Sequence, residues 1–323
     1  MKRSVVCAAF WALIAMHPST HADNHYPERP IRLIVGQSPG SAADGVARLL
    51  ATEMGKYLGQ PLVVENQAGA GGTISAASVA QMKPDGYTLM MGIASQLSLG
   101  PHLFKKAAYD PFKDFTYIAP AADVVMVLTA SAGSGIQNLE TLVKKAQAAP
   151  GRITFASSGV GSASQLSVEM LAQRAAVSLL HVPYKGTAPA LTSVMSNETD
   201  LLSNVVGAVQ GPVKAGKLIP IVVFSEQRSA LLPDVPTASE QGYALPRIAG
   251  WIGLVGPAGL PEEISATLAG AMHKAQQDAK VKAFYDAQGL VLWQGDAAGF
   301  LSRARTDSEV WGKLIREKGI VAE

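Results

Sequence analysis

The sequence predicts an α/β protein of two domains, in which helices cover sheets of mostly parallel strands. Apolar, β-rich runs alternate with segments of helical spacing along the chain, a rhythm typical of such sheets. The chain has 323 residues, which is too many for one ordinary domain and suits two. It contains no low-complexity tract or short-period repeat, so we expect compact structure throughout.

The first 22 residues are predicted to be a secretory signal peptide that is cleaved after Ala22. Lys2 and Arg3 form a basic start, Val5 to Met16 is an apolar stretch, and small residues stand at positions 20 and 22. A membrane anchor is the alternative, but a helix that crosses a bilayer needs about 20 apolar residues. We therefore expect an exported, soluble protein of the periplasm.

Cleavage at that point changes the chemistry of the chain. The single cysteine, Cys7, is lost with the leader, so the mature protein has no thiol and no disulfide. Removal of Lys2 and Arg3 lowers Lys+Arg from 27 to 25, which equals the 25 Asp+Glu and gives a formal net charge of zero. This balance predicts neither nucleic-acid binding nor attraction to anionic lipid.

The expected elements follow in chain order. Strands are predicted at Ile31–Val35, Leu62–Glu65, Tyr87–Met91, Val124–Thr129, Ile153–Ala156, Ser178–Val182, Asp200–Val206, Ile219–Phe224 and Trp251–Val255. Helices are predicted at Ala42–Leu58, Ser162–Ala175, Ala188–Met195 and Glu262–Asp278. Gly59 is placed to end the first of these helices.

Two glycine-rich turns share one design. GQSPG at 36–40 precedes Ser41-Ala-Ala-Asp44, and a second glycine-rich turn, SSGVG at 157–161, precedes Ser162-Ala-Ser-Gln165. Each serine is followed three residues later by an acceptor side chain, the form of a capping box at the start of a helix. The two turns are far apart in the sequence, so we expect them to belong to different domains and to face one another across a cleft.

GQSPG also has the G-x-S-x-G form of a serine-hydrolase nucleophile elbow, with Ser38 as the nucleophile. The oxyanion hole of such enzymes uses the backbone N–H of the next residue, which here is Pro39 and has none. No HGGG-type motif is present, and His102, His181 and His273 lack the context of a triad base. We therefore predict that Ser38 is not catalytic.

Other chemical motifs are absent from the sequence. There is no Walker A pattern and no C-x-x-C, and GAGG at 69–72 lacks the third glycine of a dinucleotide-binding loop. His17, His21 and His25 have a ligand-like spacing, but two of them lie in the leader. We expect a protein with no metal, no cofactor and no catalytic residues.

The two turns are instead suited to holding an anion. A helix N-terminus presents unpaired N–H groups and a partial positive charge, so two such termini could receive the two ends of a dicarboxylate. The residues in that role are Ser38, Gly40, Ser41, Ser158, Gly159 and Ser162. In the alternative interpretation, Ser41 and Ser162 are only helix caps and the glycines only form turns.

Seven segments in order resemble the Bug family, the periplasmic substrate-binding receptors of tripartite tricarboxylate transporters. They are YPERPIRLIV at 26–35, SPG-x-x-AD at 38–44, LGQPLVVEN-x-x-GAGG at 58–72, PDGYTLMMG at 84–92, YDPFKDF at 109–115, HVPYKGTAPALT at 181–192 and LLPDVPTASEQG at 231–242. The resemblance covers essentially the whole chain after the leader. It implies a two-domain, type II periplasmic-binding-protein fold with the ligand in the interdomain cleft.

The resemblance also implies a domain division and partners. Domain 1 is expected at 23–124 and 245–323, and domain 2 at 125–244. The implied ligand is a small carboxylate, the implied partners are the membrane subunits of a transporter driven by an ion gradient, and the receptor is expected to be a monomer. A binding protein that presents its ligand to a sensor kinase is an alternative that the sequence does not separate from uptake.

The resemblance places the ligand on loops of both domains. By position, the residues implied in binding are Gln37, Ser38, Gly40, Ser41, Asp44, Ser95, Ser158, Gly159, Ser162, Ala163, Tyr184, Thr187 and Asn204, with Gln96 beside Ser95. Asp44 also has a structural role as the third residue of a capping box. Lys185 is expected to be solvated and Trp251 to be core or hinge packing. Thr187 is expected to cap a helix, with Pro189 just inside it.

Two departures from the family pattern bear on the ligand. Members often have Phe-Pro-Pro-Gly-Gly where this chain has residues 37–41, and many have Asp-Asn where it has Ser203-Asn204. If that Asp lies in the cleft, its loss removes a partner for an amino group. We therefore expect a di- or tricarboxylate without an amine, and an aromatic dicarboxylate such as a phthalate isomer is as plausible as an aliphatic one.

Overall fold

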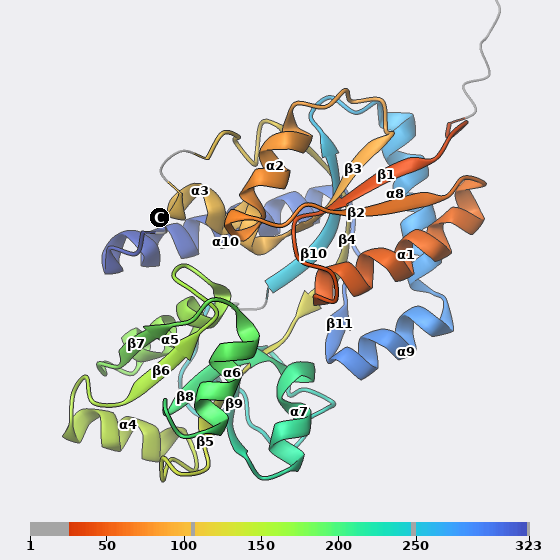
Figure 1. The fold of residues 1–323 in the computed structure, drawn as a ribbon. Coiled ribbons are helices and arrows are strands. Elements are labelled where there is room, and N and C mark those ends of the chain that lie inside the picture. The colour runs from red at the N-terminus through yellow and green to blue at the C-terminus, as the bar shows by residue number, and fades with distance from the viewer. Residues whose placement is uncertain (1–25, 105–106, 247–249, 322–323) are drawn as a thin grey trace, which may run out of the picture.

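The computed structural model of the chain describes residues 26–104, 107–246 and 250–321. They form two sheets, each flanked by helices, that lie one beside the other (Figure 1). The predicted signal peptide lies outside the described residues. No helix within those ranges combines the length and the apolar character that crossing a membrane requires.

The first sheet has six strands and is assembled from both ends of the described chain. Its spatial order is β11 (Leu290–Leu292), β4 (Phe115–Val124), β10 (Gly250–Pro257), β3 (Thr88–Ile93), β1 (Ile31–Val35) and β2 (Leu62–Asn66). The helices associated with it are α1 (Ala42–Leu58), α2 (Thr73–Ala80), α3 (Gly100–Leu103), α8 (Glu262–Gln276), α9 (Ala279–Gln288) and α10 (Ala297–Lys318). Two short helical turns, η1 (Ala70–Gly72) and η2 (Ser95–Leu99), precede α2 and α3.

The second sheet has five strands, all from the middle of the chain. Its order is β7 (Leu180–Pro183), β6 (Thr154–Ser157), β8 (Leu201–Val205), β5 (Met126–Ser131) and β9 (Leu218–Val223). Its helices are α4 (Leu139–Ala148), α5 (Ala163–Arg174), α6 (Thr187–Met195) and α7 (Val206–Lys214). The chain enters this sheet directly from β4 into β5 and returns to the first sheet in β10 (Figure 1).

Both sheets are mixed, which corrects the expectation of mostly parallel strands. β1 pairs in parallel with β2 and β3, and β6 with β7 and β8. β10 is antiparallel to β3 and β4, β11 is antiparallel to β4, and β5 is antiparallel to β8 and β9. The reason is the crossover: β4 runs out of the first sheet and β10 runs back into it beside β4, so the two strands have opposite directions.

The nine predicted strands and four predicted helices are present, with shifts at their ends. β4 and β11 were not expected. The sequence of β4 contains Pro120, which removes a ladder N–H and argues against a central strand. The register of β4 against β10 shifts between Ile252 and Gly253, next to the partner of Pro120, so an irregularity in the ladder accommodates the proline.

α10 belongs to both halves of the molecule. Near its start, Phe300 and Ala304 pack into a core of the first sheet. Near its end, Trp311, Leu314 and Ile315 pack into the core of the second sheet. Burial of apolar side chains is the main favourable term in folding. Because α10 buries such side chains in both cores, it holds the two sheets together.

The contact between α10 and the first sheet leads to a stability prediction. A Cβ at Gly253 of β10 would lie 2.3 Å from Cζ of Phe300, whose ring already packs against those of Tyr117, Trp251 and Trp293. Because the ring cannot move freely, we expect Gly253→Ala to destabilise the fold by about 2 kcal/mol or more. Urea denaturation of the mature protein, followed by circular dichroism, measures this change.

Gly270→Ala provides the matched control. Gly270 lies inside α8, where a Cβ would meet no atom within 4 Å. Alanine is the better helix former, so this variant should be more stable than wild type by about 0.5–1 kcal/mol. Equal effects of the two substitutions would contradict the tight packing of Phe300 on β10.

Candidate functional site

The first loop, residues 36–41, connects β1 to α1 and has the geometry of a capping box. Gly40 has a φ of +82°, a backbone conformation that favours glycine. Ser41 is the N-cap of α1, and its Oγ accepts a hydrogen bond from Asp44 N at 3.2 Å. The Asp44 carboxylate in turn accepts a hydrogen bond from Gly40 N at 2.9 Å. The predicted cap is confirmed. The Asp44 side chain bonds the N–H of Gly40, the residue before the N-cap, and not that of the N-cap Ser41 itself.

Asp44 is buried and its carboxylate has three partners. Besides Gly40 N, it accepts a hydrogen bond from Asn66 Nδ2 at 2.9 Å and pairs with Arg48 at 3.0 Å. Burial alone would raise the pKa of Asp44, but the hydrogen bonds from Arg48, Gly40 and Asn66 outweigh it and lower the pKa below its ordinary value. The Asp44 carboxylate is therefore ionised and holds the first loop in shape. Its oxygens accept hydrogen bonds from groups of the protein itself.

The second loop, residues 157–162, connects β6 to α5 and repeats this geometry. Gly161 has a φ of +76° and Ser162 is the N-cap of α5. The Ser162 Oγ accepts a hydrogen bond from Gln165 N at 3.3 Å, and Gln165 Oε1 accepts one from Gly161 N at 2.7 Å. Here too the prediction of a capping box is confirmed.

Both loops leave the first N–H groups of a helix free. Asp44 N and Gln165 N are used by the caps, whereas the N–H groups of Ala42, Ala43 and Ala163 have no partner in the described part of the chain. Such groups carry the partial positive charge of a helix N-terminus. Each loop therefore ends in donors that can receive an anion.

Serine hydroxyls are concentrated in the second loop. Ser164 Oγ accepts a hydrogen bond from Ser158 N at 2.9 Å and lies 3.1 Å from Ser158 Oγ and 2.9 Å from Ser162 Oγ. Ser162 Oγ also donates to Gly159 O at 2.6 Å. Ser158, Gly159, Ser162 and Ala163 are all half-buried, so the structure places these four predicted residues together at a partly accessible position.

Further residues of the second half join this loop through the backbone. Tyr184 N donates to Ser157 O at 3.0 Å, and Gly186 N donates to Ser158 O at 3.2 Å. The Tyr184 hydroxyl donates to Glu198 at 3.0 Å. Thr187 is exposed and begins α6, but its predicted role as N-cap is wrong: Gly186 is the N-cap, and no side chain caps this helix.

Asn204 stands at the end of β8, just before α7 begins. It is 6% exposed, and its Oδ1 accepts a hydrogen bond from Val205 N at 2.8 Å. Its Nδ2 is buried without a partner among the described residues. Since buried polar atoms in folded proteins are nearly always hydrogen-bonded, this amide has a donor available for a further group.

Around the first loop, Gln96 is the central contact. Its Nε2 donates to Gly72 O and Ser75 Oγ, both at 3.2 Å, and its Oε1 accepts from Ile93 N at 3.0 Å. A Cβ at Gly36 would lie 2.0 Å from this Nε2, so the start of the first loop lies directly against Gln96. Gln37 and Ser38 follow in the same loop, half-buried and exposed respectively.

The turn at 69–72 was not predicted to belong to this site. Gly69, Ala70, Gly71 and Gly72 have φ values of +149°, +45°, +64° and +91° in succession. Ser95 Oγ donates to Gly71 O at 3.4 Å, which joins this predicted residue to the turn. The sequence signal for this turn is the GAGG motif, which lacks the third glycine of a dinucleotide-binding loop. A run of glycines also permits a backbone concavity that presents N–H groups.

The end of α3 lies between the turn at 69–72 and the second loop. A Cβ at Gly161 would lie 2.6 Å from Leu103, and one at Gly71 would lie 3.7 Å from the Phe104 ring. Leu103 and Phe104 also pack into the core of the second sheet. The turn at 69–72 and the second loop are thus linked through two adjacent apolar residues, Leu103 and Phe104.

The histidines are engaged away from Ser38. His102 Nε2 contacts Ser308 Oγ at 2.8 Å, His181 Nε2 contacts Ser157 Oγ at 2.6 Å, and His273 Nε2 contacts Gly295 O at 3.0 Å. Ser157 is fully buried, so its pairing with His181 offers no nucleophile to a substrate. Within the described ranges no group of three or more His, Cys, Asp or Glu could hold a metal ion.

Ser203, whose difference from the expected family pattern was used to infer the ligand, is fully buried. Its Oγ accepts a hydrogen bond from Ser167 Oγ of α5 at 2.7 Å. The Ser203 side chain therefore points at the inner face of α5. Trp251 is buried in the core at 1% exposure and Lys185 is exposed, as expected.

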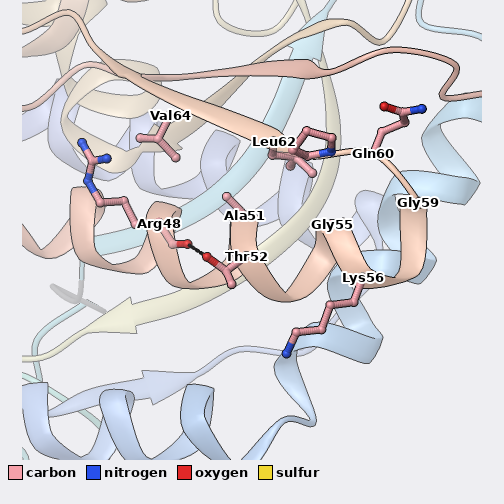
Figure 2. A pocket seen from close by; sticks show the side chains of 10 residues that line it. Arg48, Ala51, Thr52, Gly55, Lys56, Gly59, Gln60, Leu62 and Val64 are labelled. Carbon is pink, nitrogen blue, oxygen red and sulfur yellow. Dashed lines mark hydrogen bonds between the residues drawn. The ribbon is translucent and has the colours of Figure 1, made fainter.

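Of two hollows in the described part of the chain, one has no residue of either loop in its lining, and the other includes Val160 of the second loop. The first, of about 710 Å³, is a groove between α1 and β2 (Figure 2). Arg48 lines it and is linked to the first loop through its ion pair with Asp44 and through a hydrogen bond to Asn66, whose amide donates to Gln37 O. The other, of about 480 Å³, lies between α5 and the end of α10. We place the candidate site at the loops because the free donors are there.

Comparisons with known proteins agree on one family. Residues 46–320 match the family model described as "Tripartite tricarboxylate transporter family receptor". The chain is 30% identical to Protein BugT of Bordetella pertussis over 318 residues, which cover 97% of this chain and 96% of that protein.

Solved structures give the same result. The R. palustris protein Rpa4515, solved with adipate, has 26% identity and a TM-score of 0.82 over 92% of this chain and 99% of that one. MatC from Rhodopseudomonas palustris, solved with bound malate, has 30% identity and a TM-score of 0.77 over 90% of this chain and 100% of that one. The similarity confirms the expected two-domain periplasmic-binding-protein fold.

The network around Asp44 leads to a pH prediction. Because the folded-state pKa of Asp44 is lowered, its stabilising contribution is present above the unfolded-state pKa and is lost as the pH falls through the folded-state value. We expect Asp44→Asn to destabilise the protein by about 1–3 kcal/mol at pH 7, and by less near pH 3. Urea denaturation at both pH values tests this.

Glu140→Gln is the control for this experiment. Glu140 pairs with Lys144 at 2.6 Å on the exposed face of α4, and such pairs contribute little to stability. It should leave the free energy of unfolding at pH 7 close to that of wild type. An Asp44→Asn variant that matched wild type at pH 7 would show that the carboxylate does not hold the first loop.

Proposed function

The chain belongs to the tripartite tricarboxylate transporter receptor family, and from this premise we propose that it captures a small di- or tricarboxylate in the periplasm. The ligand would lie between the two sheets and be delivered to the membrane subunits of a secondary transporter driven by an ion gradient. The protein has no catalytic role in this proposal. Its proposed domains are 23–124 with 245–323, and 125–244, and it acts as a monomer.

The single observation that carries the proposal is the pair of matching loops. Each has a glycine of positive φ, a serine N-cap and free N–H groups at the start of a helix. One loop is attached to each sheet, so a ligand with two carboxylates could be held at both ends. A monocarboxylate would leave the donors of one loop without an anion.

The residues proposed to contact the ligand come from both halves. They are Gln37, Ser38, Gly40, Ser41, Ser95, Ser158, Gly159, Ser162, Ala163, Tyr184, Thr187 and Asn204, with Asp44 shaping the first loop from beneath. Most of these positions offer backbone N–H or hydroxyl groups and no cation. Such a site recognises carboxylates by hydrogen bonds and helix dipoles, and bridging water can complete the contacts.

The proposed ligand class follows from relatives. MatC was solved with malate and Rpa4515 with adipate, both aliphatic dicarboxylates. Because these two relatives hold different dicarboxylates, they support dicarboxylates as the ligand class but do not identify the dicarboxylate that this chain binds. An aromatic dicarboxylate stays within the proposal. The exclusion of amino acids is no longer part of it, because Ser203 points at α5.

A thermal-shift screen tests this function. The mature protein is heated with aliphatic di- and tricarboxylates, aspartate, glutamate, and mono- and dicarboxylated aromatics. Binding to the folded state alone adds about 2.7 kcal/mol to stability at a hundredfold excess of ligand over Kd. A shift with dicarboxylates and none with matched monocarboxylates is the expected result. No shift with any carboxylate would refute the proposed ligand class.

Asn204→Asp tests the wall formed by the second half. The substitution replaces the free Nδ2 donor with an anionic oxygen at nearly constant volume, so it should repel a carboxylate. We expect the affinity for the best dicarboxylate of the screen to fall by at least about tenfold. Isothermal titration calorimetry at pH 8, where the new carboxyl is most completely ionised, gives the measurement.

Asn138→Asp is the matched control. Asn138 is the N-cap of α4, and its Oδ1 accepts from Thr141 N at 2.9 Å, which an aspartate does equally well. The affinity of the Asn138→Asp variant for the same dicarboxylate should equal that of wild type. If both variants bound as wild type does, Asn204 would not be part of the ligand site.

A secreted serine hydrolase that uses Ser38 is the rival function. Pro39 supplies no N–H for an oxyanion, and no described histidine contacts Ser38. Under our proposal, wild type and Ser38→Ala both show no turnover of ester substrates. Turnover by wild type that Ser38→Ala abolished would establish the rival.

Export and delivery need their own tests. Mass spectrometry of the protein secreted by a bacterial host should give an N-terminus at Asp23 if the leader is cleaved after Ala22.

Uptake of labelled dicarboxylate by cells that carry the receptor, with and without the transporter's membrane subunits, distinguishes delivery from signalling. Uptake that did not depend on the receptor would contradict the delivery role.

A further inference from the structure

His181 is the one residue of the HVPYKG motif whose side chain reaches the second loop. It lies in β7, opposite Phe155 of β6, and its half-buried ring stacks on the Phe155 ring with centroids 4.9 Å apart. Its Nε2 lies 2.6 Å from Ser157 Oγ. Ser157 is the last residue of β6 and the first of the second loop.

The Ser157 hydroxyl, which contacts His181, also forms hydrogen bonds with the backbone of Gly159. The Ser157 Oγ accepts a hydrogen bond from Gly159 N at 3.2 Å and lies 3.1 Å from Gly159 O, to which it can donate. Gly159 O also accepts from Ser162 N at 3.2 Å and from Ser162 Oγ at 2.6 Å. Gly159 has a φ of +133°, a conformation that favours glycine, and its peptide is contacted on both its N–H and its C=O by the side chains of Ser157 and Ser162.

The Ser157 hydroxyl has only one proton to donate. When His181 Nε2 carries a hydrogen, it donates to Ser157 Oγ, and the Ser157 proton remains available for Gly159 O. When Nε2 carries no hydrogen, it accepts a hydrogen bond from the Ser157 hydroxyl, and Gly159 O loses that donor. In the neutral ring the tautomer of His181 sets which arrangement is present, whereas the protonated ring always donates from Nε2 and so leaves the Ser157 proton for Gly159 O.

Charge acts in the same direction. A protonated His181 places a positive charge behind a loop that already carries the N-terminus of α5. The charged group that acts on His181 is Glu169 of α5, whose carboxylate is itself paired with Lys318 of α10 at 3.1 Å. Burial lowers the pKa of His181, and Glu169 opposes this in part, so the ring is neutral at pH 7 and gains its charge in acid.

We propose that His181 is a positioning residue for the second loop: through Ser157 it orients the Gly159 peptide, and its protonation strengthens the hold of this loop on an anion. The inference rests on the proposed carboxylate-binding function. A bound anion raises the pKa of His181 relative to the free protein. Affinity is therefore highest in acid and decreases as the pH rises through the pKa of His181 in the complex.

Calorimetric titration of malate and adipate between pH 5.5 and 8 tests the inference. Carboxylates titrate themselves at the acidic end, so the result is the difference between wild type and His181→Gln at each pH. Glutamine keeps an N–H for Ser157 Oγ and cannot become charged. We expect the wild-type advantage to grow by about three- to tenfold from pH 8 to pH 5.5. A constant ratio across this range would overturn the proposal.

His102→Gln is the matched control. His102 is also half-buried, its pKa is also lowered by burial, and it also contacts a serine, Ser308 on α10 at 2.8 Å. It does not contact either loop, so His102→Gln should reproduce the wild-type pH profile. If this variant abolished the pH dependence, protonation of His181 would not be its source.

An NMR measurement decides the positioning role without any ligand. Imidazole nitrogen shifts of the 15N-labelled protein give the pKa and tautomer of His181, and amide shifts report on Gly159. The Gly159 amide of wild type should titrate with the pKa of His181, and Ser157→Ala should remove that coupling. A Gly159 amide that ignores His181 would overturn the inference even if carboxylates bind. Failure of every carboxylate to bind would refute the proposed function and leave this coupling intact.

Discussion

The structure depends on a buried ion pair at the point where the chain passes between its two sheets. Arg303 and Asp307 of α10 pair at 2.8 Å, and Asp307 accepts a hydrogen bond from the Trp251 indole at 3.1 Å. Arg303 also approaches Asp123 at 3.8 Å. Trp251 is the second residue of β10, which returns from the second sheet, and Asp123 lies near the end of β4, which leaves the first, so α10 is fixed to both crossover strands.

Burial raises the pKa of Asp307, while the charge and hydrogen bonds of Arg303 and the indole of Trp251 oppose that rise. Removal of two charges from water is costly, and the ion pair repays that cost only when its geometry is maintained. Here the geometry sets the angle at which α10 leaves the first sheet and reaches the core of the second. The two loops take their relative positions from this arrangement, because each is attached to a different sheet.

Local patterns in the sequence predicted the local structure well. Ile31–Val35 and Ala42–Leu58 were placed at the observed residues, and both capping boxes were recognised, because these features depend on neighbours within a few positions. Strand direction was not predictable in this way. An apolar run has the same appearance whether its partner is parallel or antiparallel, and the Pro120 strand violates the pattern that marks a strand.

In the candidate site, too, local features could be predicted and long-range contacts could not. The serines and glycines of the loops were identified because turns and caps require those residue types. The contacts of Gln96 with the 69–72 turn and of His181 with Ser157 were missed, since they join residues some 24 positions apart. The direction of the Ser203 side chain could not be predicted for a related reason: alternate residues of a strand face opposite sides, and only the sheet shows which side faces α5.

The position of α10 also governs the order in which the protein can be built. Trp311, Leu314, Ile315 and Ile320 cover the core of the second sheet, although that sheet is made from residues 126–223. While the chain is synthesised from its N-terminus, the middle segment has no cover for this apolar surface until the last residues have emerged. The second sheet therefore cannot complete its core until synthesis of the chain is nearly finished.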